Sequence, residues 1–253
     1  RKKASTCRKL MRSARVRGLN NSSCHPLHIN FLALSENNLT GVIPAFLSNL
    51  TELTQLELAV NYYTGQIPVE LGALSRLEIL FLHLNFLEGT IPASLREIPS
   101  EMGNKLQNLQ KLYFINNNIS GRIPVTFSNL SQITLLDLSV NYLEGEVPEE
   151  LGKLNLEILY LHSNNLVSNS SLRNIPIKLS QCSLMMQLDL YFNSLQGPLP
   201  SEIGVFANLG LSLNLSNNNL DGEIPATIGN LVSLQAIDLS VYRFSGIIPK
   251  FSW

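Results

Sequence analysis

Leucines alternate with other residues in short stretches that recur along the whole chain. Each stretch has the form L-x-L, as in Leu56-Glu57-Leu58 and Leu136-Asp137-Leu138. Alternation with period two predicts a short strand whose leucines all face one side. Because a strand this short is not stable alone, we expect each one to pair in parallel with the strands of the neighbouring repeats.

An asparagine follows each L-x-L stretch and begins a second pattern. Gly stands four residues and Pro seven residues after the Asn, as in Asn61, Gly65 and Pro68. Two further copies are altered, because the copy at Asn164 lacks the Gly and Tyr242 replaces the Asn of the last copy. The nine positions are separated by 24, 24, 32, 24, 23, 29, 25 and 24 residues, and a period in the twenties predicts a solenoid. The regular copies begin at Asn37, Asn61, Asn85, Asn117, Asn141, Asn193 and Asn218.

The residues after each strand predict how the chain turns. The Asn amide both donates and accepts, so it is expected to satisfy backbone groups of its own turn and of the adjacent turn. The Gly suits a backbone with positive φ, and the residue before the Pro is expected to be extended. Leucines three residues apart, such as Leu71 and Leu74, then predict a 3-10 or short helical turn on the convex side.

The combined pattern L-x-x-L-x-L-S-x-N-x-L-x-G-x-I-P resembles the plant-type leucine-rich repeat over about residues 27–249. The resemblance implies an α/β horseshoe solenoid of nine repeats with a parallel concave sheet and a second short strand at G-x-I-P. Residues 1–26 are expected to form a separate basic segment, either disordered or an imperfect cap. Residues 27–253 form the repeat domain, which is irregular at 93–108 and 165–176 and truncated at its C-terminus.

The irregular segments and the last repeat have two interpretations each. Insertions in solenoids map to loops on one face and can be functional, but the junction at 165–176 also fits a splice that deleted repeats. The last coil stops four residues after Pro249, without a convex half or a polar cap. We therefore expect Ile237, Leu239 and Ile247 to be partly exposed or covered by another chain, which includes self-association.

Charge is distributed unevenly along the chain. The whole sequence has a net charge of −1, but its first 17 residues hold eight basic and no acidic residues, which leaves 10 basic and 19 acidic residues in the remainder. A negative solenoid is a poor candidate for binding nucleic acid. The basic start indicates a solvated tail or a gene-model artefact, or alternatively a transit peptide or a segment that binds anionic surfaces. No apolar run is long enough to span a membrane, and no secretory signal is recognisable.

Cysteines and histidines give no sign of a cofactor. Cys7 and Cys24 do not match the paired-cysteine caps that secreted plant relatives usually carry, and Cys182 is expected to be a buried small apolar residue. The four histidines do not cluster with the cysteines, so we expect no metal site. N-x-[ST] sequons are compatible with secretion. They lie at Asn20, Asn21, Asn38, Asn49, Asn118, Asn129, Asn169 and Asn214.

The concave sheet provides the candidate ligand-binding residues. They flank the inward leucines and are all expected to point to solvent. Clustered aromatic side chains on such a face are typical of peptide or protein recognition, although cross-strand packing that merely shields the sheet is an alternative. The candidates are Glu57, Phe81, His83, Tyr113, Asp137, Tyr160, His162, Asp189 and Tyr191.

Catalysis is not expected from these residues. His83 and His162 lie three strands apart, about 14 Å, which is too far for one metal ion or a proton relay. Asp137 and Asp189 lie about 9–10 Å apart, at the edge of the geometry of inverting glycosidases. An open sheet is, however, expected to provide neither desolvation nor a raised pKa.

The resemblance to the ectodomains of plant leucine-rich-repeat receptor-like kinases implies an extracellular module. Such a module would bind a peptide or protein ligand on its concave face, together with a co-receptor, in defence or developmental signalling. The alternative is a secreted inhibitor of microbial cell-wall hydrolases, similar to polygalacturonase-inhibiting proteins.

Overall fold

The computed structural model describes residues 28–92, 106–168, 175–206, 208–241 and 243–250. Several of the predictions above concern residues outside these ranges. They are the basic segment 1–26, residues 93–105 and 169–174 of the two irregular segments, Cys7, Cys24, Asn20, Asn21, Asn169 and Tyr242.

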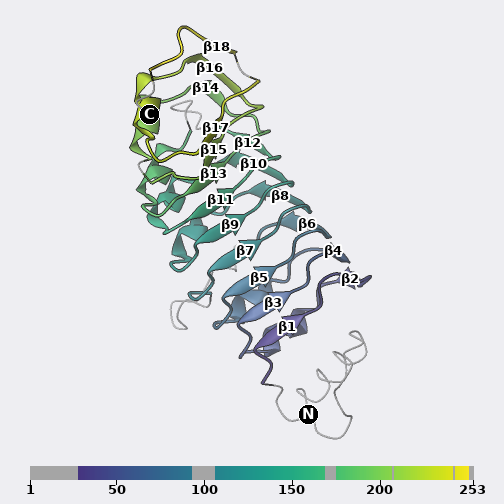
Figure 1. Ribbon diagram of the computed structural model, residues 1–253. Helices are drawn as coiled ribbons and strands as arrows, with labels where there is room; N and C mark the ends of the chain where they lie inside the picture. Colours follow the sequence, from purple (N-terminus) through teal and green to yellow (C-terminus); the bar gives the residue numbers. More distant parts are fainter. Residues whose placement is uncertain (1–27, 93–105, 169–174, 207, 242, 251–253) are drawn as a thin grey trace, which may run out of the picture.

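Within the described residues, one short strand from each repeat joins a nine-stranded parallel sheet in the order of the sequence (Figure 1). The register aligns the central leucines, so that Leu56 pairs with Leu80 and Leu112 with Leu136. These four side chains are fully buried, which confirms the predicted inward alternation. The strands are β1 (Phe31–Ala33), β3 (Gln55–Glu57), β5 (Ile79–Phe81), β7 (Lys111–Tyr113), β9 (Leu135–Asp137), β11 (Ile158–Tyr160), β13 (Gln187–Asp189), β15 (Ser212–Asn214) and β17 (Ala236–Asp238).

A second strand follows in each repeat, and these strands form one six-stranded and one three-stranded parallel sheet. The short second strands that the resemblance implied are confirmed, but they end before the Ile-Pro of G-x-I-P, since β4 ends at Gly65 and β6 at Thr90, before Ile91-Pro92. The reason is that proline has no N–H to give to the ladder. The strands are β2 (Thr40–Val42), β4 (Tyr62–Gly65), β6 (Phe86–Thr90), β8 (Asn118–Arg122), β10 (Tyr142–Glu146), β12 (Asn165–Val167), β14 (Gln196–Pro198), β16 (Asn219–Glu223) and β18 (Arg243–Ser245).

The division between the two outer sheets lies at the repeat that lacks its glycine. There the backbone connection is a single bridge between Val167 and Ser194. The Ser168 hydroxyl donates to the Gln196 carbonyl and accepts from the Gln196 N–H, both at 2.8 Å. A side chain thus replaces the backbone ladder, while β11 and β13 remain paired in the nine-stranded sheet.

The convex side consists of short 3-10 helices, as the leucine spacing predicted. Each of the seven in the described part has five residues and begins directly after a proline. None of them has the length or apolar content to cross a bilayer. They are η1 (Ala45–Asn49), η2 (Val69–Ala73), η4 (Val125–Asn129), η5 (Glu149–Lys153), η6 (Ile177–Gln181), η7 (Ser201–Val205) and η8 (Ala226–Asn230).

The asparagine amides tie each repeat to the one before it. Asn61 Nδ2 donates to the carbonyls of Leu58 at 3.2 Å and Ala59 at 3.0 Å in its own turn, and to Leu34 of the preceding repeat at 2.9 Å. Its Oδ1 accepts from the Leu39 N–H at 3.0 Å. The dual role predicted for this amide is therefore confirmed.

Burial decreases in the last repeat. Leu136 and Leu138 are fully buried at the centre of the array, whereas Ile237 and Leu239 only pack partly against the core and Ile247 is 86% exposed. The expected exposure of these side chains is confirmed.

Cys182 is free and buried. Its thiol lies 3.3 Å from the Leu151 carbonyl. Burial raises the pKa of the Cys182 thiol to about 11, so the group remains neutral and unreactive at physiological pH. The expected role as a small core residue is confirmed.

Candidate ligand-binding surface

The sheet register brings all nine candidate residues into two adjacent rows, which we call the concave patch. In the first row, Asp137 lies between Tyr113 and Tyr160. Phe81 and Asp189 extend the row on either side. The concave patch consists of Glu57, Phe81, Tyr113, Asp137, Tyr160 and Asp189 in the first row and His83, His162 and Tyr191 two residues further along their repeats.

Aromatic rings on one side of Asp137 pack against each other across strands. Phe81 and Tyr113 make an edge-to-face pair with centroids 4.8 Å apart and planes at 86°. His83 joins them, 5.7 Å from Phe81 and 6.0 Å from Tyr113. All three side chains remain partly exposed, so this cluster both covers the sheet and presents a surface.

A matching cluster lies on the other side of Asp137. His162 and Tyr191 stack with centroids 4.6 Å apart and planes at 19°, and Tyr160 lies 6.5 Å from His162. The Tyr160 hydroxyl donates to Gln187 Oε1 at 2.9 Å, which fixes the ring. Cross-strand aromatic packing, the alternative explanation of these residues, therefore occurs in both clusters, and the rings still keep an exposed part.

Asp137 differs from the expectation that every candidate points freely to solvent. The residue is only 5% exposed, so that expectation is wrong for it. The reason is the size of its register neighbours, since Tyr113 and Tyr160 lie on both sides of a shorter side chain. Asp137 Oδ1 accepts from the Ser139 N–H at 3.0 Å and from the Ser139 hydroxyl at 2.5 Å. Burial nevertheless raises the pKa of Asp137, outweighing these hydrogen bonds and the nearby His162 and His83.

Two further groups show that the sheet does perturb acidity. Burial raises the pKa of Asp189 against the hydrogen bond from the Tyr191 N–H at 3.1 Å and the nearby His162. Burial also lowers the pKa of His83, whose Nδ1 is buried and has no hydrogen-bond partner in the described part. The expectation that an open sheet leaves carboxylate pKa values unshifted is wrong, because the aromatic neighbours remove water locally.

Asp238 in the last repeat provides a comparison within the chain. Its Oδ1 accepts from the Ser240 N–H at 2.9 Å, the same contact that Asp137 makes with Ser139. Asp238 is exposed, and these hydrogen bonds lower its pKa. The surroundings of Asp137, and not its hydrogen-bond pattern, therefore set its acidity.

Known proteins share this repeat geometry. The Leucine Rich Repeat family model matches residues 28–50, 108–130, 132–154 and 211–231. Receptor-like protein 41 of Arabidopsis thaliana is 30% identical over 156 residues, which cover 60% of this chain and 17% of that protein. The ectodomain of the Arabidopsis thaliana receptor kinase GASSHO1/SCHENGEN3, solved with CASPARIAN STRIP INTEGRITY FACTOR 2, superimposes with a TM-score of 0.80 at 35% identity over 87% of this chain. The chain is a plant-type leucine-rich-repeat protein.

This leucine-rich-repeat protein spans only part of its relatives. It covers 25% of the GASSHO1/SCHENGEN3 chain. The Arabidopsis receptor kinase HAESA, solved with the peptide hormone IDA and the co-receptor SERK1, superimposes with a TM-score of 0.62 at 30% identity, covering 88% of this chain and 43% of that chain. The chain therefore spans less than half the length of these two receptor chains to which it is similar.

Sequence reasoning missed the residues that begin the concave strands. Leu135 and Ile158 are half-buried on this face, two residues before Asp137 and Tyr160, and Gln187 holds the Tyr160 hydroxyl. Period-two alternation, extended by one step, would have placed them on the same face.

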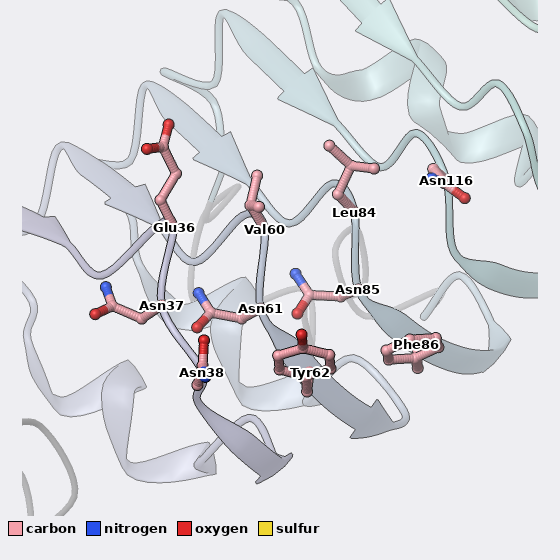
Figure 2. A pocket seen from close by; sticks show the side chains of 10 residues that line it. All are labelled: Glu36, Asn37, Asn38, Val60, Asn61, Tyr62, Leu84, Asn85, Phe86 and Asn116. Carbon is pink, nitrogen blue, oxygen red and sulfur yellow. The ribbon is translucent and has the colours of Figure 1, made fainter.

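A lateral pocket of about 600 Å³ lies beside the concave sheet in the first four repeats. Figure 2 shows Val60 and Leu84 above it and the rings of Tyr62 and Phe86 below, with ring centroids 6.0 Å apart and planes at 16°. No sequence pattern predicted this pocket, because most of its residues occupy the variable positions around the repeat asparagines. It is lined by Glu36, Asn37, Asn38, Val60, Asn61, Tyr62, Leu84, Asn85, Phe86 and Asn116.

The described sequons differ in accessibility. Asn38, Asn49, Asn118 and Asn129 are exposed, which a glycosylation site requires. Asn214 is half-buried in the concave sheet, and its Oδ1 accepts from Ser216. Glycosylation of the exposed four stays a prediction.

Proposed function

We propose that this chain is a ligand-recognition module of a plant receptor or receptor-like protein and binds a peptide or protein through the concave patch. The observation that carries the proposal is the row of aromatic and carboxylate side chains that crosses successive strands from Glu57 to Asp189. Partly exposed aromatic side chains around a desolvated centre are typical of the residues that dominate binding energy.

The relatives support this class of function. Two of them were solved with CASPARIAN STRIP INTEGRITY FACTOR 2 and with the peptide hormone IDA, the latter together with the co-receptor SERK1. We infer by analogy that this chain acts outside the cell, in defence or developmental signalling, and that a co-receptor is its second partner.

An enzymatic role is not part of the proposal. Asp137 and Asp189 belong to strands separated by β11, and backbone N–H groups of their own repeats hold one oxygen of each. Two separated carboxylates held in this way are better suited to contacting a ligand than to transferring protons together. The alternative function, inhibition of a cell-wall hydrolase, stays a prediction that an inhibition assay with polygalacturonase would test.

Panning a random library of 12-residue peptides displayed on phage would test the proposal. Selected peptides, synthesised and titrated by calorimetry, should bind the wild type and should bind a concave variant at least about 100-fold more weakly, because anchoring aromatics typically contribute about 2 kcal/mol or more each. Circular dichroism would show that both variants remain folded. The concave variant carries Phe81→Ala, Tyr113→Ala and Tyr160→Ala, and the convex control carries Arg76→Ala, Lys153→Ala and Asn230→Ala.

Two results would contradict the proposal. One is that no peptide is enriched, or that the enriched peptides bind the concave variant as tightly as the wild type. The other is that the convex control loses binding while the concave variant keeps it.

A further inference from the structure

The centre of the concave patch is a buried carboxylate without a cation. Both hydrogen bonds from Ser139 fall on Oδ1 of Asp137, so Oδ2 receives none from the described residues. The ion pairs of the described part join Arg76 to Glu52 and Lys178 to Glu149, and neither includes Asp137. A negative group therefore lies under the surface that would receive a ligand.

Burying this charge is unfavourable for the free protein. An ionised carboxylate loses hydration when it is covered, and the loss is offset only by a paired cation or by full hydrogen bonding. Ser139 supplies hydrogen bonds to one oxygen only, and neither these hydrogen bonds nor the nearby His162 and His83 offset the burial of Asp137. A cation brought by a ligand would complete the pairing at Oδ2 without any rearrangement of the sheet.

The two tyrosines provide walls for such a cation. Tyr113 and Tyr160 are the register neighbours of Asp137 on either side, so their Cα atoms lie about two strand spacings, or about 10 Å, apart. A cation that reached Oδ2 would lie beside these rings, and cation–π attraction acts within roughly 6 Å of a ring centroid. Because Asp137 is only 5% exposed, a guanidinium or ammonium group would reach Oδ2 by displacing the part of the rings that covers it.

Neighbouring charges favour the same sign of ligand. Glu57 and Asp189 lie in the same row as Asp137, and Lys111 is the basic residue on the adjacent strand β7. Burial lowers the pKa of His83, which keeps this imidazole neutral at physiological pH. The concave patch is therefore negative on balance and aromatic at its centre.

We propose that the concave patch recognises a basic side chain of a peptide, held by the Asp137 carboxylate between the rings of Tyr113 and Tyr160. This inference rests on the proposed function, because it specifies the chemistry of the peptide that the concave patch binds. Arginine suits the site best, since its flat guanidinium can stack on a tyrosine ring while an N–H donates to Oδ2. Lysine supplies the same charge without the stacking plane.

The chain itself offers a conservative test variant. In repeat eight, Asn214 occupies the position of Asp137, and its Oδ1 accepts from the Ser216 N–H at 3.1 Å and hydroxyl at 2.8 Å. Asp137→Asn should therefore keep the hydrogen bonds from Ser139 and remove only the charge. The matched control is Asp238→Asn, which removes the exposed carboxylate of the last repeat.

The experiment uses the 12-residue peptides selected on the wild type, each compared with a version whose basic residue is replaced by neutral citrulline. We expect the selected peptides to share one arginine or lysine, and citrulline to weaken binding about 10- to 100-fold, the range of a charge-assisted hydrogen bond. Asp137→Asn should cause a loss of the same size, and the two changes together should cost little more than either alone. Asp238→Asn should leave the affinity unchanged.

The possible results separate the inference from the proposed function. Selected peptides without a shared basic residue, or additive losses from citrulline and Asp137→Asn, would overturn the inference while the proposed function stands. Since the citrulline peptide is tested on the unaltered protein, this comparison does not depend on how the variant folds. Peptides that bind the concave variant normally, or a failure to enrich any peptide, would overturn both.

Discussion

The asparagine amides that hydrogen-bond between adjacent repeats give a quantitative prediction for the variant Asn141→Ala. Asn141 is 8% exposed, and its Nδ2 donates to the carbonyls of Phe114 at 3.0 Å, Leu138 at 3.2 Å and Ser139 at 2.9 Å. Its Oδ1 accepts from the buried Ile119 N–H at 3.0 Å. The alanine variant removes all of these hydrogen bonds at once.

The expected loss follows from the number of groups left unpaired. The two Nδ2 hydrogens and one Oδ1 acceptor correspond to about three hydrogen bonds, each contributing roughly 0.5–1.5 kcal/mol net. The Ile119 N–H keeps no acceptor in its buried position, which costs roughly 1–3 kcal/mol. When the Ile119 N–H is counted once, the two other hydrogen bonds and this unpaired group together amount to about 2–6 kcal/mol, so we expect Asn141→Ala to lower the free energy of unfolding by about that amount.

Urea denaturation followed by circular dichroism measures this loss, and Asn37→Ala is its control. Asn37 is exposed, and its side-chain Nδ2 donates to the carbonyls of Leu34 and Ser35 in its own repeat. Its replacement should cost less than about 1 kcal/mol. Equal losses for the two variants would refute the conclusion that the amides tie adjacent repeats together.

Three further predictions concern neighbouring residues. Leu138 is fully buried, so Leu138→Ala should cost about 2–5 kcal/mol in the same assay, and a loss below about 0.5 kcal/mol would place it outside the core. Because the pKa of Asp137 is raised above its usual 3.8 by burial, its contribution to stability is complete below that value and is lost as the pH rises through the folded-state pKa. Asp137→Asn should therefore be more stable than the wild type at about pH 7, and melts at about pH 3 should show no difference. Val140 has a φ of 52°, which is unfavourable for a β-branched residue, and the equivalent positions of two other repeats are Asn116 and Asn217. Val140→Asn should therefore stabilise the protein by about 1 kcal/mol, and a lower melting temperature would contradict this.

The repeating features of the fold could be predicted because each depends on residues close in sequence. The concave strands follow from the alternating leucines, and the hydrogen bonds between repeats follow from the asparagine amide. The 3-10 helices follow from the spacing of the leucines after each proline. The extent of the second strand could not be derived in this way, since the resemblance placed it over G-x-I-P, whereas β4 ends at Gly65 and β6 at Thr90. The hydroxyl of Ser168 replaces a missing backbone pairing, which depends on where Gln196 lies in the next repeat.

The candidate site could be predicted in position but not in electrostatics. Asp137 and Asp238 both lie two residues before a serine that hydrogen-bonds to them, yet burial raises the pKa of the first and hydrogen bonds lower the pKa of the second. The difference arises from Tyr113 and Tyr160, each 23 or 24 residues from Asp137 in sequence and adjacent to it in the sheet. The pattern of one sequence identifies which residues share a row of the sheet. The size of the side chains on the neighbouring strands decides which of these residues are shielded from water.

The central claim is that the concave patch binds the ligand, and photo-crosslinking tests it most directly. A selected peptide with a photoreactive residue beside its basic side chain would be cross-linked to the protein and the adducts mapped by mass spectrometry. Cross-links within residues 111–115, 135–139 and 158–162 are predicted. Cross-links confined to the convex 3-10 helices, or to Tyr62 and Phe86 of the lateral pocket, would contradict the claim.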